Sequence, residues 1–202
     1  MTDSNPSMEL HNNLPTFHAR TRKEWRRWLE KKGASEKSVW LIIYHKASDT
    51  RSIYHDEAVE EALCFGWIDS VAHKRNKESK YQFFTHRKPK SNWSKINRER
   101  AERMIASGLM TPAGQKLIDL AKKTGTWEAM VDVHNMVIPP DLQKQFDRNK
   151  KALKNFQAFS PSSRRIILGW IHSAKKPETR KKRIEETVRL AKDNIKANHY
   201  LQ

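Results

Sequence analysis

Nine residues at positions 87–95, RKPKSNWSK, bring together side chains that bind anions. They comprise four cations, a proline, a tryptophan and three small hydrogen-bonding residues: Arg87, Lys88, Pro89, Lys90, Ser91, Asn92, Trp93, Ser94 and Lys95. Asn92 or Ser94 is suited to cap a helix that begins near Trp93. The first N–H groups of a helix lack partners and carry partial positive charge, so nearby cations strengthen their attraction for an anion. The stretch predicts a phosphate or carboxylate site at a helix start, with charge from Arg87 and Lys90.

A purely structural role also fits this stretch. Ser91, Asn92 and Ser94 would then only cap the helix, Trp93 would pack on a sheet, and the cations would face water. Capping sequences of this kind are common at helix starts. The sequence leaves both interpretations open.

Trp67 and Asp69 belong to the tetrapeptide GWID at residues 66–69, between an expected helix and an expected strand. Asp69 is placed to accept a backbone hydrogen bond or to pair with Arg87 or Lys90. We expect a structural ion pair. The alternative is that Trp67 and Asp69 form one wall of the ligand site.

Sequence motifs for metal, nucleotide or catalytic chemistry are absent. HExxH, CxxC, GxxxxGK[ST] and GxGxxG do not occur, so zinc, P-loop and dinucleotide sites lack support. His73 and His86 have no carboxylate or nucleophile at a spacing that indicates a triad. Cys64 lies in an apolar run and is typical of a buried thiol. We therefore expect no metal and no cofactor, and a binding protein rather than an enzyme; a small-molecule enzyme of unrecognised type is a further alternative.

The positive charge of the chain is regional. Forty Lys and Arg against 23 Asp and Glu give a formal net charge of +17 over 202 residues. Residues 73–103 carry a net +8 and residues 161–196 a net +7, whereas the N-terminal third is close to neutral. This distribution suits an anionic ligand or a polyanion, although lysine-rich faces are often only solvated.

Non-specific nucleic-acid binding is the main alternative function. A polyanion surface is predicted at Arg180, Lys181, Lys182 and Arg183. Bases stack on aromatic rings, and several rings lie near cations in the sequence: Tyr81, Phe83, Phe84 and Trp93. No RNP1 or zinc-finger motif accompanies them.

The elements that must position these side chains change in type along the chain. Residues 20–32 are predicted as an amphipathic helix, 38–46 as a buried strand and 54–66 as a helix with acidic first turns. Two further strands are expected at 67–74 and 80–88, and helices at 94–108 and 111–125. Thr111, Pro112 and Gly125 mark the ends of the last helix. A connector ending in two prolines precedes three to four helices after Pro140.

These elements predict an α+β fold: a small N-terminal sheet of about three strands covered by helices, followed by a helical C-terminal unit. We expect a disordered leader at 1–15, an α+β domain at 16–138 and a helical unit at 139–202. No secretory signal and no run of ~18 apolar residues is present. The expected location is the cytoplasm.

Four segments resemble the YdeI/OmpD-associated family, also called bacteriocin-protection proteins. They are EEALCFGWIDS at 60–70, RKPKSNWSKIN at 87–97, MTPAG at 110–114 and SAKKPETRKKRIEETV at 173–188, and the resemblance extends roughly from residue 20 to residue 196. It implies an accessory protein linked to stress tolerance, specifically of bacteriocins or cationic antimicrobial peptides, and, by the family name alone, association with an outer-membrane porin. It implies no catalytic residues. Because a chain of charge +17 repels cationic peptides, protection would be indirect or would depend on a local acidic surface.

Overall fold

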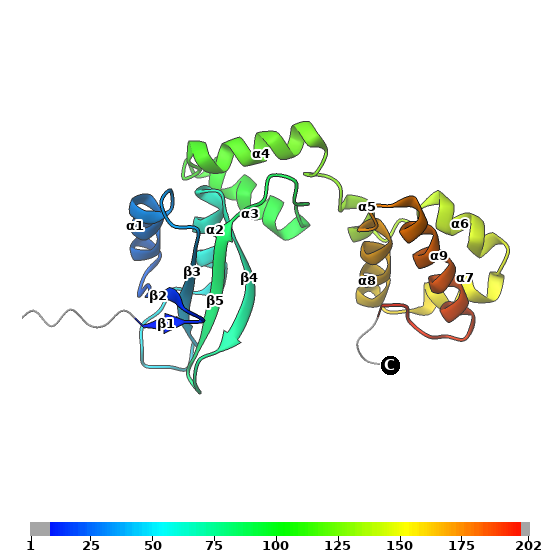
Figure 1. Ribbon diagram of the computed structural model, residues 1–202, viewed down its shortest axis with the longest axis horizontal. Coiled ribbons are helices and arrows are strands. Elements are labelled where there is room, and N and C mark those ends of the chain that lie inside the picture. The colour runs from blue at the N-terminus through cyan, green and yellow to red at the C-terminus, as the bar shows by residue number, and fades with distance from the viewer. Residues whose placement is uncertain (1–8, 199–202) are drawn as a thin grey trace, which may run out of the picture. The chain divides into compact units, whose positions relative to one another are not determined.

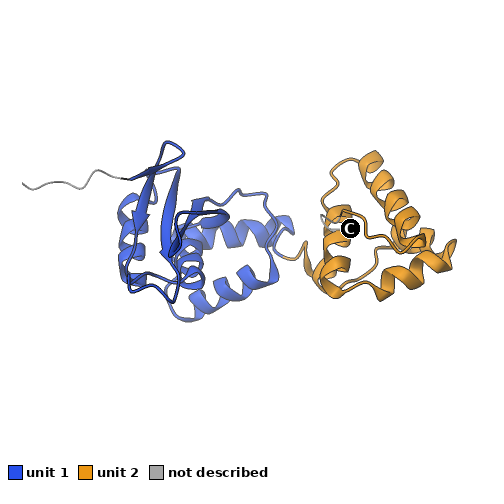
Figure 2. Ribbon diagram, turned by 90° about the horizontal axis from the view of Figure 1, so that it is seen from below, with its two compact units in different colours: residues 1–127 blue, residues 128–202 orange. Residues whose placement is uncertain are grey.

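The computed structural model describes residues 9–198, which form two compact units. Figure 1 labels the helices and strands, and Figure 2 colours the two units, of which unit 1 ends at Trp127 and unit 2 begins at Glu128. Unit 1 contains a sheet with helices, and the described part of unit 2 is helical. The α+β class is therefore confirmed. Trp127, two residues beyond the helix expected at 111–125, packs in the core of unit 1.

Unit 1 is built on a five-stranded sheet with the order β1-β2-β3-β5-β4. The strands are β1 (Leu10–His11), β2 (Leu14–His18), β3 (Ser38–Tyr44), β4 (Trp67–Lys74) and β5 (Ser79–His86). β2 pairs with β3 in parallel, and the other pairs are antiparallel. β3 and β5 pair although residues 45–78, which include one helix and β4, lie between them.

The expectation of about three strands was wrong, because β1 and β2 add two. They lie at residues 10–18, partly within the stretch 1–15 where the sequence indicated a leader; residues 1–8 of that stretch lie outside the described residues. Asn12 and Asn13 join the two strands with φ of 51° and 60°, the left-handed pair that a tight hairpin turn requires. A two-residue strand shows no alternation, and Pro15 argues against a strand, so the pattern was too weak to recognise.

The helices of unit 1 are α1 (Arg22–Lys32), α2 (His55–Cys64), α3 (Lys95–Ala106) and α4 (Pro112–Thr124). Alternate residues of β3, Val39, Leu41 and Ile43, point into one core with Trp25 and Leu29 of α1. All five side chains are at most 4% exposed. The 3.6-residue period of α1 and the two-residue period of β3 thus meet in a single apolar layer.

The other face of the sheet is covered near β3 by the segment around β1. Trp40 points to this face and is 3% exposed. The His11 ring lies edge-on to Trp40 at 4.6 Å and stacks on Tyr81 at 4.0 Å between centroids. Glu9 holds the segment in place, because its carboxylate lies 2.8 Å from the Arg75 guanidinium and also accepts the Tyr81 hydroxyl proton. The hydrogen bond from Arg75 lowers the pKa of Glu9.

A buried carboxylate ties α1 to α2. The Glu61 side chain is 2% exposed, and its two oxygens accept hydrogen bonds from Arg22 Nε and Arg26 Nη1. Arg26 also donates to the carbonyl of Leu109 at 2.9 Å. A carboxylate at this depth needs both cations, because an uncompensated charge in the interior is costly.

Replacing Glu61 by Gln should lower the free energy of unfolding by about 2–4 kcal/mol, because the change leaves two guanidinium groups without their shared counter-ion. Glu30→Gln is the matched control: Glu30 also pairs with Arg26, but its side chain is 48% exposed, so its loss should cost less than about 1 kcal/mol. Chemical denaturation of both variants measures the difference. Equal losses in the two variants would show that the buried carboxylate contributes no more to the free energy of unfolding than the exposed one.

Unit 2 consists of five helices in the described residues. They are α5 (Val131–His134), α6 (Pro140–Asp147), α7 (Lys150–Ala158), α8 (Pro161–His172) and α9 (Pro177–Lys192). Phe146, Phe156 and Ile167 are at most 1% exposed and form the centre of a second core. Among the described residues of the chain, no helix is long and apolar enough to cross a membrane.

The two cores predict separate unfolding of the two units. Phe146→Ala should cost unit 2 about 3–5 kcal/mol through lost burial and a cavity. Hydrogen exchange followed by mass spectrometry should then show faster exchange in α6–α9 and unchanged exchange in β3 and β5. An equal acceleration in β3 and β5 would show that the units unfold as one.

Candidate functional site

The basic stretch at 87–95 connects β5 to α3. Ser94 is the N-cap of α3, and its hydroxyl accepts the N–H of Asn97 at 3.3 Å. Of the two residues proposed as the cap, Asn92 and Ser94, the structure selects Ser94. Trp93 is 2% exposed, and its ring packs on Trp127 at 4.9 Å between centroids. The stretch is therefore a helix start anchored by a buried tryptophan.

Arg87 carries the unusual feature of this stretch. It is 7% exposed, and its guanidinium lies 3.9 Å from the centroid of the Trp93 ring. Its Nη2 donates to the carbonyl of Asn92 at 2.6 Å, but its Nε is buried and has no hydrogen-bond partner. Arg87 forms no ion pair with a carboxylate in residues 9–198.

The electrostatics of Arg87 follow from this burial. Loss of hydration lowers the pKa of its guanidinium to about 10. The side chain is thus still charged at neutral pH, and the fold bears the cost of holding that charge without a counter-ion. Arg98 and Arg164 also have a buried Nε without a partner, but both residues are only half-buried. Arg87 is the deepest of the three.

Arg87 lines a cavity of about 410 Å³ in unit 1. The end of α1, the turn before β4, the end of β5 and the first turns of α4 form its walls: Leu29, Glu30, Gly33, Ala34, Phe65, Gly66, His86, Arg87, Ala113, Lys116 and Leu117. Two basic groups, Arg87 and Lys116, and the imidazole of His86 face one carboxylate, Glu30, which is itself paired with Arg26 at 3.3 Å. The lining therefore carries more positive than negative groups.

The first turn of α4 borders the same cavity. Thr111 occupies the N-cap position, but its hydroxyl donates to the carbonyl of Cys64 and does not cap the helix. The close approach of α4 to α2 requires Gly114, because a Cβ there would lie 2.4 Å from the Cys64 oxygen and 2.6 Å from the Leu63 oxygen. The start of α4 adds partial positive charge to the wall that holds Ala113.

The remaining sequence-predicted residues lie outside the cavity. Trp67 is fully buried, and its indole N–H donates to the carbonyl of Gly33 at 3.0 Å. Asp69 pairs with His55 at 3.0 Å, a different partner from the expected Arg87 or Lys90. Lys90, Ser91 and Ser94 lie on the loop before α3 and do not line the cavity. Arg87 and Trp93 are in direct contact, and the carbonyl of Asn92 accepts a hydrogen bond from Arg87.

His86 and Lys116 are cavity residues that the sequence did not assign to the site. His86 was considered only as a general base. Its position directly before Arg87 could have suggested a shared wall. Lys116 lies five residues after the predicted cap Thr111, so one helical turn separates it from the helix start. No sequence signal showed that α4 packs beside the end of β5.

The predicted polyanion surface of unit 2 is partly engaged in internal contacts. Arg180 forms a two-fold hydrogen-bonded ion pair with Asp141, and this contact lowers the pKa of Asp141. Arg183 lies over the Trp170 ring at 5.1 Å and donates to Ser173. Lys181 and Lys182 are exposed. Two of the four cations therefore brace unit 2.

Potential metal ligands and the single cysteine were the other reactive groups to consider. No group of three or more His, Cys, Asp or Glu side chains there is arranged to hold a metal ion. Cys64 is buried, and burial raises the pKa of its thiol to about 11. It is therefore a neutral thiol at physiological pH and a poor nucleophile.

Two family models match the chain, one within unit 1 and one within unit 2. Residues 17–117 match the model described as domain of unknown function (DUF8412), and residues 135–194 match the model described as bacteriocin-protection, YdeI or OmpD-associated. No curated protein and no solved structure gives a match. The first three of the four motifs that suggested the resemblance lie within residues 17–117, and the fourth lies within 135–194. The chain therefore belongs to the DUF8412 family, whose model matches half of its residues, and residues 135–194 of unit 2 are similar to the bacteriocin-protection, YdeI or OmpD-associated family.

Proposed function

We propose that unit 1 binds a small anionic ligand in the cavity beside Arg87. The observation that carries this proposal is a guanidinium that is 7% exposed and has no carboxylate partner in the described residues. Proteins rarely bury a charge without pairing it, because dehydration costs several kcal/mol per ion. A bound anion would supply the missing counter-ion and accept the free N–H of Arg87 Nε.

The walls define the class of ligand. A cavity of about 410 Å³ is within the range for small molecules and larger than a bare phosphate or sulfate needs. Leu29, Phe65 and Leu117 offer apolar contact, whereas Arg87 and Lys116 offer charge. A guanidinium binds planar carboxylates and phosphates through parallel hydrogen bonds. The favoured ligand is a small organic phosphate or carboxylate with an apolar part.

The matched family of unit 2 links the chain to bacteriocin protection by description. We infer an accessory protein whose contribution to bacteriocin tolerance is indirect, through recognition of the anionic ligand. Direct capture of a cationic peptide is disfavoured, since the formal net charge of +17 repels it. The internal contacts of Arg180 and Arg183 reduce the basic surface left for a nucleic acid, so we adopt no second function.

Arg87→Met keeps the apolar stem and removes the charge. In anion-free buffer the variant should be as stable as the wild-type protein, or more stable by up to about 2 kcal/mol, because it removes a buried unpaired charge. The folded-state pKa of Arg87 is about 10, so the penalty is full at pH 6–8 and would decrease only as the pH rises above that value. Urea denaturation at pH 7 measures the change.

Arg26→Met is the matched control, because Arg26 is paired with the buried Glu61. It should lose about 2–4 kcal/mol. A comparable loss in Arg87→Met would contradict the proposal and assign the guanidinium a structural role through Trp93 and Asn92.

The ligand site itself is tested by thermal shift with phosphate, sulfate and citrate against chloride at constant ionic strength. An anion at 100 times its Kd should stabilise unit 1 by about 2.7 kcal/mol. Arg87→Met should abolish the specific part of this stabilisation, and Lys116→Gln should reduce it. Sulfate and phosphate stabilise many proteins through exclusion from the surface, so the difference between variants decides the result.

Lys90→Gln separates the cavity from the loop. Lys90 does not line the cavity, so this variant should keep the anion response. If Lys90→Gln removes the response and Lys116→Gln keeps it, the site is the loop that the sequence analysis proposed. If Arg87→Met responds to anions as the wild-type protein does, neither site is correct.

A further inference from the structure

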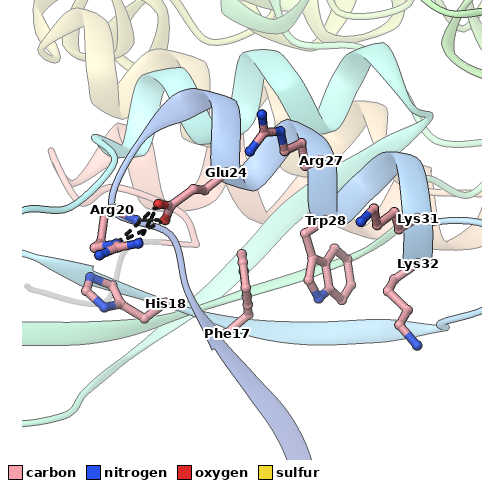
Figure 3. Close-up of a pocket in the computed structure, with 8 residues that line it drawn as sticks. All are labelled: Phe17, His18, Arg20, Glu24, Arg27, Trp28, Lys31 and Lys32. Carbon is pink, nitrogen blue, oxygen red and sulfur yellow. Dashed lines mark hydrogen bonds and ion pairs between the residues drawn. The ribbon is translucent and has the colours of Figure 1, made fainter.

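A second hollow lies in unit 1 between β2 and α1 (Figure 3). It shares no lining residue with the Arg87 cavity, although both border the C-terminal half of α1. Its volume is about 500 Å³. Phe17 of β2 and Trp28 of α1 lie side by side in the close-up, with Lys31 and Lys32 beyond Trp28 and the Arg20–Glu24 pair at the opposite end. The hollow combines aromatic rings with cations.

The aromatic part is a stack of three rings. Trp28 stacks on Trp25 with 5.1 Å between centroids and an interplanar angle of 17°. Phe17 lies 5.8 Å from Trp28 and 6.1 Å from Trp25. Trp25 is fully buried, whereas Phe17 and Trp28 are half-buried. The inner ring fixes two outer rings that still present area to a ligand.

The indole N–H of Trp28 is an unused donor. Trp25 and Trp67 donate their indole N–H groups to the carbonyls of Ala58 and Gly33, each at 3.0 Å. Trp28 has no hydrogen bond within the described residues, and its nitrogen is not among the buried unpartnered atoms. The group is therefore accessible, although buried tryptophans usually place this donor against an acceptor.

The charged groups of the hollow are unequal in their pairing. The Glu24 carboxylate accepts hydrogen bonds from the backbone and side chain of Arg20 at 2.9 and 3.1 Å, and these bonds lower the pKa of Glu24. Arg27, Lys31 and Lys32 are exposed and form no ion pair within residues 9–198. The free charge in the hollow is positive and lies on α1 around Trp28.

We propose that this hollow binds an aromatic carboxylate. Its ring would stack on Phe17 and Trp28, and its carboxylate would accept the Trp28 N–H and face Lys31 and Lys32. Charge-assisted hydrogen bonds of this kind are stronger than neutral ones, and the stack adds aromatic contact. A polynucleotide fits less well, because the Arg20–Glu24 pair places a carboxylate at one end of the short cationic row.

The lysines on α1 also have a structural explanation, since cations in the last turn complement the helix dipole. That role predicts no ligand and no dependence of binding on Trp28. The dipole explanation does not account for the accessible indole donor of Trp28 or for the half-buried pair of rings.

The test uses 2-naphthoate as the probe and the indole ¹H–¹⁵N signals of the full chain as the readout, with Trp28 assigned through Trp28→Phe. The Trp28 signal should shift with saturation as 2-naphthoate is added. The neutral analogue 2-naphthalenemethanol should bind at least about tenfold more weakly than 2-naphthoate, because it lacks the charge-assisted bonds. Sulfate, which lacks a ring, should leave the Trp28 signal unchanged.

Matched variants separate a site from a general charge effect. The double variant Lys31→Gln/Lys32→Gln should weaken 2-naphthoate about fivefold or more, since each exposed charge contribution is modest. Lys23→Gln/Lys37→Gln removes the same charge from exposed positions outside the hollow and should bind as the wild-type protein does. Arg87→Met should leave the shift of the Trp28 signal unchanged, whether or not 2-naphthoate also enters the Arg87 cavity, because Arg87 does not line the hollow. Failure here and failure of the proposed function are therefore distinguishable.

Three outcomes would overturn the proposal: no shift of Trp28 at millimolar probe, equal binding of the neutral analogue, or equal weakening by the two double variants. A larger shift of the same signal with a short single-stranded oligonucleotide than with 2-naphthoate would also overturn it and assign the hollow to nucleic acid.

Discussion

A single positive charge in the interior of unit 1 sets the constraint on which the proposed site depends. Arg87 leaves β5 through a backbone hydrogen bond from its N–H to the carbonyl of Gly66 at 2.9 Å, and its guanidinium then lies against Trp93. The aromatic face and one carbonyl stabilise the cation in part. They do not neutralise it, and Arg87 has no carboxylate partner among the described residues.

The surrounding elements hold this charge at a fixed place. Gly66 turns the chain with φ of +75° after α2, and Gly114 lets the first turn of α4 approach the carbonyls at the end of α2. The ring of Trp93 packs on Trp127, and its backbone N–H donates to the carbonyl of Thr126 at 3.1 Å. Rigid supports of this kind reduce the ordering cost of binding. The contrast with Glu61 is informative, since that buried carboxylate already has two guanidinium partners.

The sequence predicted most of the fold because its local signals were strong. Thr111, Pro112 and Gly125 mark the ends of α4 as observed, and the dense apolar run of β3 lies in the sheet. β1 and β2 were missed because two short strands, one with a proline, have no readable period. Their place in the sheet depends on the parallel pairing of Thr16–His18 with Trp40–Ile42, which local patterns do not encode.

The candidate site was predictable in composition but not in geometry. Arg87, Trp93 and the helix start at Ser94 were recognised from a local cluster. The burial of Arg87 and Trp93 was not recognised, because a stretch with four cations in nine residues is typical of exposed loops. Recognising His86 and Lys116 as neighbours of Arg87 required knowledge of how α4 packs. Asp69 pairs with His55, fourteen residues away in the sequence, and not with a cation of the loop.

The most direct test of the account is side-chain NMR of the arginine Nε–H groups during titration with phosphate. Arg87 Nε is predicted to shift with saturation and to exchange more slowly with water, because an anion then occupies its free donor. Arg98 and Arg164, whose Nε atoms also lack partners but whose residues are half-buried, are predicted to change little. An unchanged Arg87 signal, or equal changes in all three, would contradict the claim that the charge of Arg87 is kept for a ligand.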